Sequence, residues 1–147
     1  MTQSLSERAS RISTAEVKKV DGDVFKLPEQ LQTVVVIETA QGIIDNGGLE
    51  YFFESDFPRN PPYAFFVDVY RRIGAEGVAH CIETASRMFP FPDAHLHEGK
   101  RQVWLDGVKH DKTHEFVGLS RRACGDESVF RKLADYVEKN RHAFDGV

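Results

Sequence analysis

Residues 43–55 have the sequence Ile43-Ile44-Asp45-Asn46-Gly47-Gly48-Leu49-Glu50-Tyr51-Phe52-Phe53-Glu54-Ser55. An apolar run with helical spacing ends at Asp45, and aromatic and acidic residues resume directly after the two glycines. Because glycine adopts positive φ at little cost, the segment predicts a sharp turn between two helices at Asn46, Gly47 and Gly48. Three consecutive aromatic residues cannot all face inward from one helix, so we expect one of Tyr51, Phe52 and Phe53 to be exposed.

The chain has the size and composition of one globular domain. It contains 147 residues, of which 41% are apolar and 29% charged. No apolar run approaches the ~20 residues that span a bilayer, and the N-terminal residues lack the regions of a signal peptide. We therefore expect a single domain over residues 1–147, in the cytoplasm and without membrane contact. Cys81 and Cys124 fall on expected apolar helix faces, which predicts two buried free thiols.

The first half of the chain predicts a series of helices. Capping-box patterns at Ser4 and Ser13 place the start of a helix between them, and this helix runs to about Val20. Pro28 suits the first turn of a helix that continues to the glycine turn. The run Val34–Ile37 also resembles a buried strand, but it passes into Ala40 without a turn signal, so we favour helix.

The second half of the chain predicts fewer regular elements. We expect Asn60 to cap a helix that Gly74 ends, and a further helix to reach Pro90. An irregular stretch follows from Phe91, and the last helix is predicted to open at Asp126. Together these patterns predict an all-α fold, a single compact domain of about six to eight helices.

Charge is spread unevenly along the chain. The net charge is −4; residues 1–98 contain 9 bases and 15 acids, and residues 99–147 contain 10 bases and 8 acids. No basic residue occurs from Leu27 to Pro58. This balance argues against direct binding of nucleic acid or membrane, which needs a basic face. The acidic part either solvates the outer faces of helices or attracts a protein with a basic surface.

Glu38 interrupts a strongly apolar run. A carboxylate on the inner face of a helix is costly unless it is hydrogen-bonded or paired. It is either a tuned acid or partner-binding anion, or a structural residue that accepts hydrogen bonds from backbone N–H groups or Asn46 near the glycine turn. We favour the structural role, because no second catalytic group is visible beside it. Glu38, Asn46, Gly47 and Gly48 are therefore predicted to form a structural motif.

The candidate catalytic and metal-binding patterns are weak. His110 and His114 have the i,i+4 spacing that chelates zinc on a helix, but their surroundings resemble an exposed loop. His95 and His97 would complete such a site only if they folded nearby. No nucleophile elbow, phosphate loop or cofactor signature is present, so we expect no cofactor and do not favour an enzyme. A metal-dependent enzyme with this histidine cluster is kept as the alternative.

A resemblance to a known family rests on three segments. These are Glu38 with residues 45–55, then Tyr70-Arg71-Arg72-Ile73-Gly74-Ala75, and finally the C-terminal run from Phe130 to Asn140 with Phe144. The chain resembles, over roughly residues 28–144, the bacterial family of unknown function that contains a DNA-mimic protein. Leu49 stands where that family usually has phenylalanine, and Tyr51 replaces a frequent Gln-Phe arrangement, as in a divergent member.

The resemblance implies an all-helical fold, a homodimer and, in the studied relative, an acidic surface that imitates DNA phosphates. Such a surface competes for the basic groove of a DNA-binding protein. For this chain it implies a non-enzymatic protein-binding or regulatory module that blocks a basic DNA-binding protein or a nuclease. The acids expected to bind the partner are Glu29, Asp45, Glu50, Glu54 and Asp56.

Overall fold

The computed structural model describes residues 3–145. Within this range it contains seven α-helices, three short 3-10 helices and no strand, which confirms the predicted all-α fold. In chain order the elements are α1 (Leu5–Lys19), η1 (Val24–Lys26), α2 (Glu29–Glu54), α3 (Tyr63–Arg72), α4 (Glu76–Ser86), η2 (Ala94–Leu96), α5 (Glu98–Val108), α6 (Glu115–Ala123), α7 (Ser128–Lys139) and η3 (Arg141–Phe144).

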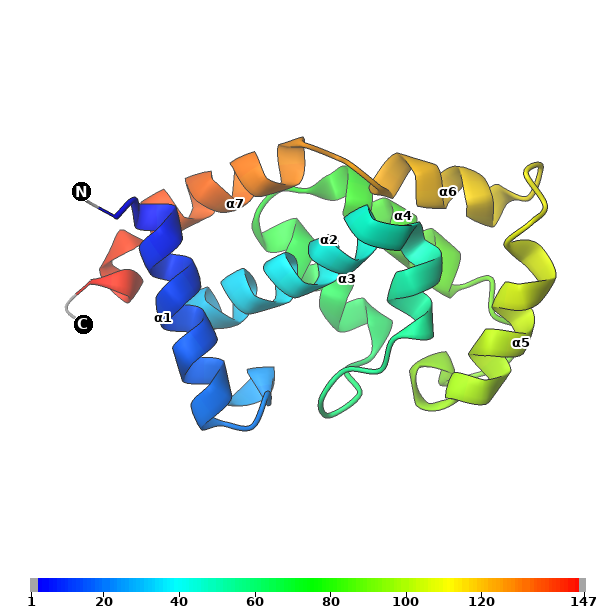
Figure 1. Ribbon diagram of the computed structural model, residues 1–147, viewed down its shortest axis with the longest axis horizontal. Helices are drawn as coiled ribbons and strands as arrows, with labels where there is room; N and C mark the ends of the chain where they lie inside the picture. The colour runs from blue at the N-terminus through cyan, green and yellow to red at the C-terminus, as the bar shows by residue number, and fades with distance from the viewer. Residues whose placement is uncertain (1–2, 146–147) are drawn as a thin grey trace.

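The long helix α2 organises the domain. Figure 1 shows it running through the middle of the molecule, with α1 crossing one end and α5 lying at the other. It packs against α1, α3, α5, α6 and α7, while α3 packs closely on α4 and α4 on α6. Its inward side chains Ile37, Ile44, Leu49, Phe52 and Phe53 are fully buried. The core is therefore assembled around one helix, as its continuous apolar sequence requires.

Local sequence signals explain the parts of α1, α2 and α3 that were predicted correctly. The Ser4 hydroxyl accepts a hydrogen bond of 3.1 Å from the Glu7 backbone N–H, so Ser4 caps α1. Val34–Ile37 is helical, as favoured. After α3, Gly74 has φ +78°, and its N–H and that of Ala75 bond back to the final carbonyls of the helix. This is the left-handed helix ending that glycine favours.

Asn60 does not cap a helix, which corrects the prediction. Its φ of 42° is left-handed, and its N–H donates to the Phe57 carbonyl at 2.8 Å to close a turn. Pro62, in extended conformation, occupies the cap position, and α3 begins at Tyr63. The reason is the Pro61-Pro62 pair, because a residue before proline is kept out of the helical region.

The stretch after Phe91 is more regular than predicted, because it contains α5 and α6. Helix α5 was missed because it buries only two of its residues, Arg101 and Leu105. They lie one turn apart, so an arginine occupies the place where a core-facing helix normally shows an apolar residue. The buried face of α6, which includes Phe116 and Leu119, has helical spacing, but the helix is short and contains Gly118, a residue that disfavours helix.

Two smaller predictions also need correction. Helix α7 begins at Ser128 rather than at Asp126. Asp126 lies just before the helix, and its carboxylate accepts hydrogen bonds from the backbone N–H and the hydroxyl of Ser128. Cys81 is buried as expected, but Cys124 is exposed, because it follows the last residue of α6 and lies outside the apolar face. Both thiols are free.

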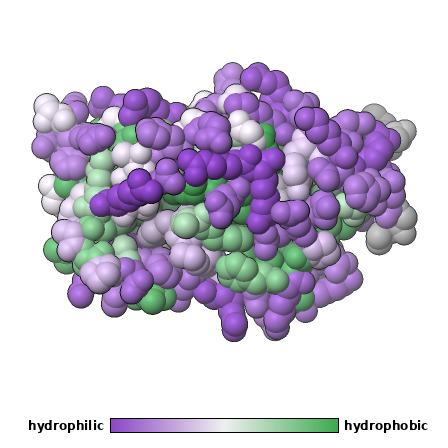
Figure 2. Space-filling view, turned by 180° about the vertical axis from the view of Figure 1, so that it is seen from behind, coloured by the Kyte–Doolittle hydropathy of each residue, from purple (hydrophilic) through white to green (hydrophobic). Residues whose placement is uncertain are grey.

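The surface includes several large apolar side chains. Figure 2 shows apolar residues reaching the back face of the molecule beside strongly hydrophilic ones. Exposed apolar residues of the domain include Phe25, Tyr51, Leu96, Val103 and Phe130. Among the helices described, none is long and apolar enough to cross a membrane.

Candidate protein-binding surface at the corner of helix α2

Helix α2 breaks at the predicted glycine turn. Gly47 has φ −152° and ψ 18°, Gly48 has φ 73° and ψ −171°, and regular helix continues on both sides. A β-carbon on Gly48 would collide with the Ser120 hydroxyl of α6, and one on Gly47 would collide with the Tyr51 ring. The same Ser120 hydroxyl accepts a hydrogen bond of 2.9 Å from the Leu49 N–H, which the break leaves without a helical partner. Both glycines are therefore required by the close approach of other groups.

A buried polar network fixes the angle of this corner. The Gln41 side chain is fully buried, and its amide nitrogen donates to the Asp45 carboxylate at 2.7 Å and to the Ala123 carbonyl at 3.1 Å. The Tyr70 hydroxyl donates to the Gln41 carbonyl oxygen at 3.0 Å. The Gly125 N–H donates to the Asp45 carboxylate at 2.7 Å. Helices α2 and α3, the end of α6 and the connection after it are thus joined by bonds in which both polar atoms of the Gln41 amide have partners.

Burial also decides the ionisation state of Tyr70. The low-dielectric surroundings raise the pKa of the Tyr70 hydroxyl far above its usual value of 10.0, and the nearby Asp45 charge raises it further. Tyr70 therefore stays protonated at neutral pH and remains a hydrogen-bond donor to Gln41. The network joins helices α2 and α3 to the end of α6.

Glu38 does not brace the corner, contrary to prediction. It lies eight residues before Asn46, about 12 Å along the helix axis. It lines instead a small cavity of about 130 Å³ at the junction of α1, α2 and α7, with Ser6, Phe130 and Leu133 among its neighbours. Burial raises the pKa of Glu38, and a hydrogen bond with Ser10 opposes that rise. Gln41 and Asp45 occupy the role that was predicted for Glu38.

Three of the five predicted partner-binding acids lie together beside α5. Glu50 forms an ion pair with Lys109 at 3.5 Å, and the Glu54 carboxylate accepts a hydrogen bond of 3.3 Å from the Gln102 amide. Asp56, just after α2, accepts a hydrogen bond of 2.7 Å from the fully buried Arg101.

The remaining two predicted acids lie elsewhere. Glu29 is at the start of α2, where its carboxylate is 3.4 Å from the Arg72 guanidinium. Asp45 belongs to the bracing network. That the five acids bind a partner stays a prediction.

Glu50 and Glu54 influence each other because they lie one helical turn apart. Burial is the main cause of a raised pKa at Glu50, and the Glu54 charge adds to it, whereas Lys109 lowers it. Like charges at i,i+4 repel each other on a helix. The second half of α2 therefore holds two carboxylates that an additional cation would stabilise.

A shallow groove follows the outer side of the corner. It has a volume of about 600 Å³. The seven lining residues, which we call the α2 corner surface, are Thr39, Gly42, Ile43, Asn46, Tyr51, Glu54 and Ser55. Tyr51 is 44% exposed while Phe52 and Phe53 are buried, which confirms that one of the three aromatic residues faces solvent. The lining contains one carboxylate and no basic side chain.

An apolar cleft lies next to the corner surface. Thr39 lines both, and the cleft has a volume of about 210 Å³ between α1, η1, α2, α3 and the segment before α3. Phe57, Phe65 and Val36 contribute much of its apolar wall. A partner on the corner surface therefore has both a polar rim and an apolar recess within reach, the combination found at protein interfaces.

The four candidate histidines occupy separate positions. His95 and His97 flank the end of η2 and lie edge-on to Tyr63 and Phe91, respectively. His110 is exposed in the loop after α5, and the Nδ1 atom of His114 accepts a hydrogen bond of 3.0 Å from the Phe116 N–H at the start of α6. Within residues 3–145, no group of three or more His, Cys, Asp or Glu side chains could hold a metal ion. The alternative histidine centre is therefore not assembled.

Sequence reasoning missed Gln41 and Arg101, the two buried polar anchors near this surface. Gln41 carried a usable signal, because it lies four residues before Asp45 on the inner side of α2 and interrupts an apolar run. Arg101 carried none, because its carbonyl partners Phe53 and Ala94 are backbone groups that the sequence cannot reveal.

Comparison with known proteins identifies the family. The model of the DMP19-like protein family matches residues 25–140. The chain belongs to the DMP19-like family. This confirms the predicted family and agrees closely with the predicted region, residues 28–144; the divergence suggested by Leu49 and Tyr51 stays a prediction. No curated protein and no solved structure matches the chain.

Proposed function

We propose that this DMP19-like protein is a non-enzymatic binding module whose α2 corner surface holds a partner protein with a basic surface. The observation that carries the proposal is the composition of that groove. It presents an exposed aromatic ring, Tyr51, and a carboxylate, Glu54, with no cation in its lining. Tyrosine is enriched at protein interfaces, and a carboxylate without a local cation favours a basic partner.

Within that role, Glu50 and Glu54 imitate DNA phosphates and compete for the groove of a DNA-binding protein or nuclease. Two carboxylates one turn apart on a rigid helix offer a fixed pair of negative charges. Their mutual repulsion is relieved by an incoming lysine or arginine, which supports their use as a binding pair. Family membership adds to this support, because the resemblance that led to the family includes a DNA mimic. The homodimer that the same resemblance implies is also proposed.

Lys109 limits how much binding energy the two carboxylates can contribute. Its ammonium lies 3.5 Å from Glu50 and 3.0 Å from Asp106, so it partly neutralises the acidic pair in the free protein. A basic partner replaces one exposed ion pair by another, which yields little net energy by itself. Affinity must then come from Tyr51 and the apolar cleft, while the carboxylates determine which partner is accepted.

The test is affinity capture from lysate of the source cells with wild type, E50Q/E54Q and the control D68N/E127Q. Asp68 and Glu127 are exposed and form no ion pair with the described residues, so both double variants remove two negative charges. We expect a basic DNA-binding protein to be retained by wild type and control at about 50 mM salt, and lost by E50Q/E54Q or at about 500 mM salt.

Two outcomes would contradict the proposal in different ways. Retention of the partner by E50Q/E54Q, or equal loss with the control variant, would show that these carboxylates do not select it. If the captured protein binds its DNA and this protein simultaneously, phosphate imitation is wrong although the binding module stands. Addition of that DNA should otherwise release the partner.

A further inference from the structure

A cationic cleft lies at the end of α3, away from the α2 corner surface. It has a volume of about 320 Å³ and is formed by the last turn of α3, the segment after it and one face of α7. Its lining residues are Arg71, Arg72, Ile73, Gly74, Lys132, Asp135, Tyr136 and Lys139. Four cationic side chains and one carboxylate line the cleft, and three carboxylates outside the lining, Glu29, Glu76 and Glu83, pair with its two arginines.

One wall of the cleft is held rigidly by α2. The Arg72 guanidinium donates to the Gln32 side-chain oxygen at 2.7 Å and to the Thr33 hydroxyl at 3.3 Å, and it pairs with Glu29 at 3.4 Å. The Tyr136 hydroxyl lies 3.3 Å from the same Thr33 hydroxyl. Arg72 and Tyr136 are thus fixed relative to each other before any ligand arrives, which reduces the entropic cost of binding.

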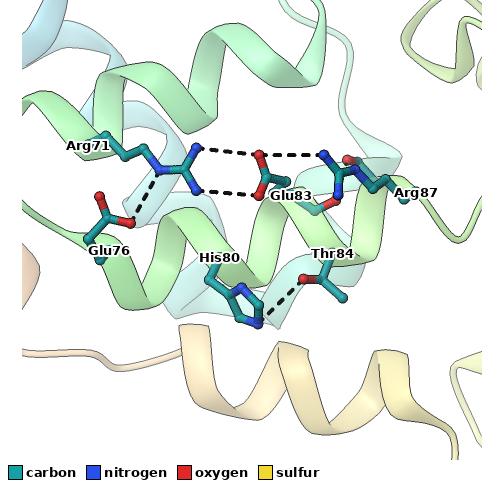
Figure 3. A network of polar contacts seen from close by, with 7 residues as sticks. Arg71, Glu76, His80, Glu83, Thr84 and Arg87 are labelled. Carbon is teal, nitrogen blue, oxygen red and sulfur yellow. Dashed lines mark hydrogen bonds and ion pairs between the residues drawn. The ribbon is translucent and has the colours of Figure 1, made fainter.

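Arg71 lines the cleft but is held by carboxylates of α4. Figure 3 shows its guanidinium turned toward α4, where it meets Glu83 at 3.3 Å and Glu76 at 3.2 Å. Glu83 is shared with Arg87 at 3.8 Å, so one carboxylate serves two arginines there. Because Glu76 and Glu83 balance Arg71 and Arg87, this network adds no net charge, and the unpaired positive charge of the cleft comes from the lysines of α7.

The other wall carries two lysines that have no anionic partner. Lys132 and Lys139 are seven residues apart on α7, so they project from the same face two turns apart, with Tyr136 between them. Within residues 3–145, neither lysine forms an ion pair within 4.0 Å. Asp135 is the one carboxylate in the lining. The two ammonium groups flank a space whose floor is a fixed guanidinium and a phenol.

We propose that this cleft binds the phosphate group of a small phosphorylated ligand or of inorganic phosphate. A phosphate dianion needs more than one cation, and a rigid arginine combined with mobile lysines supplies that arrangement. The volume falls in the range of small-molecule sites. Ile73 and the Tyr136 ring offer an apolar surface for an organic group attached to the phosphate. This binding site is independent of the partner proposed for α2.

The experiment is a titration followed by backbone amide NMR at constant pH and ionic strength. The probes are inorganic phosphate, phenyl phosphate and sodium chloride. We expect saturable shifts at Ile73, Gly74 and Tyr136 with both phosphates and none with chloride. Tighter binding of phenyl phosphate would identify a phosphate ester as the ligand, and tighter binding of inorganic phosphate would identify the free anion.

Three variants separate a built site from general attraction of anions. K132Q/K139Q should raise the Kd for phosphate at least about tenfold. The control K18Q/K112Q, which removes two exposed lysines elsewhere, should leave the Kd unchanged. D135N should lower the Kd, because it removes the opposing charge. The proposal is overturned by shifts that do not saturate, by equal shifts with chloride, or by a K132Q/K139Q variant that binds as wild type does.

Discussion

Gly48 illustrates how one missing side chain fixes the packing of two helices. Its positive φ and the Ser120 hydroxyl beside it both exclude a β-carbon. We expect Gly48→Ala to lower the free energy of unfolding by about 2 kcal/mol or more. Gly42→Ala is the matched control on the same helix, because nothing lies within 4 Å of its β-carbon position; it should raise stability by about 0.5–1 kcal/mol. Urea denaturation measures both, and equal effects would contradict the role assigned to the corner.

Glu38 gives a pH-dependent contribution to stability. Its pKa in the folded protein is raised above the ordinary value of 4.5, so the folded state binds more protons than the unfolded state just above that pH. The contribution of Glu38 to the free energy of unfolding is fully present below pH 4.5, and it is lost as the pH rises through the pKa of the folded state. Glu38→Gln removes this loss. The free energy of unfolding of the variant, relative to that of wild type, should therefore be higher at pH 7 than at pH 4. Urea denaturation at each pH measures this difference. A difference that does not depend on pH would count against a raised pKa.

At the scale of elements, α5 is held to α2 by a single buried guanidinium. Arg101 is 1% exposed and donates to the carbonyls of Phe53 and Ala94, each at 2.8 Å, and to Asp56 at 2.7 Å. Arg101→Met would leave the Phe53 and Ala94 carbonyls without this donor, while the half-exposed Asp56 carboxylate can be hydrated. We expect a loss of about 2–4 kcal/mol in the free energy of unfolding, because two carbonyl acceptors lose their partner.

The control for this change is Arg87→Met, which removes an exposed arginine with one ion pair of 3.8 Å. It should cost less than about 1 kcal/mol. Arg101→Lys should fall between the two, because an ammonium cannot reach three acceptors in different directions. If both Arg101 variants were as stable as Arg87→Met, α5 would be held by apolar contacts such as Leu105 alone.

At the scale of the molecule, the sequence predicted the parts of the fold that follow from apolar spacing. The all-α class, α1 and the Gly47-Gly48 turn were predicted because capping residues, helical stripes and glycines are local signals. Helix α5 was not, because an arginine takes a core position that only tertiary partners can satisfy. The wrong role for Glu38 has the same origin, since its surroundings come from α1 and α7.

The residue types of the candidate site could be predicted from the sequence, but the ion pairs that its acids form could not. The acidic second half of α2 is evident from residues 43–55, as is the exposed aromatic. The cations that meet its acids, Lys109 and Arg101, lie about fifty residues away along the chain, so no spacing rule connects them. The bases of the last third, evident only as a mild charge excess in sequence, become a defined cleft when α7 packs beside α3.

The break in α2 also fixes the length of the chain at the corner. Each residue of an α-helix turns the following side chains by about 100°, and Ser120 holds Leu49 at a set position beyond the glycines. One residue inserted before Gly47 would turn Phe52 and Phe53 out of the core and carry Glu50 inward. A gain or loss of a single codon at the corner would therefore change the packing of the whole second half of α2, whereas a substitution in the outer groove would change one exposed side chain.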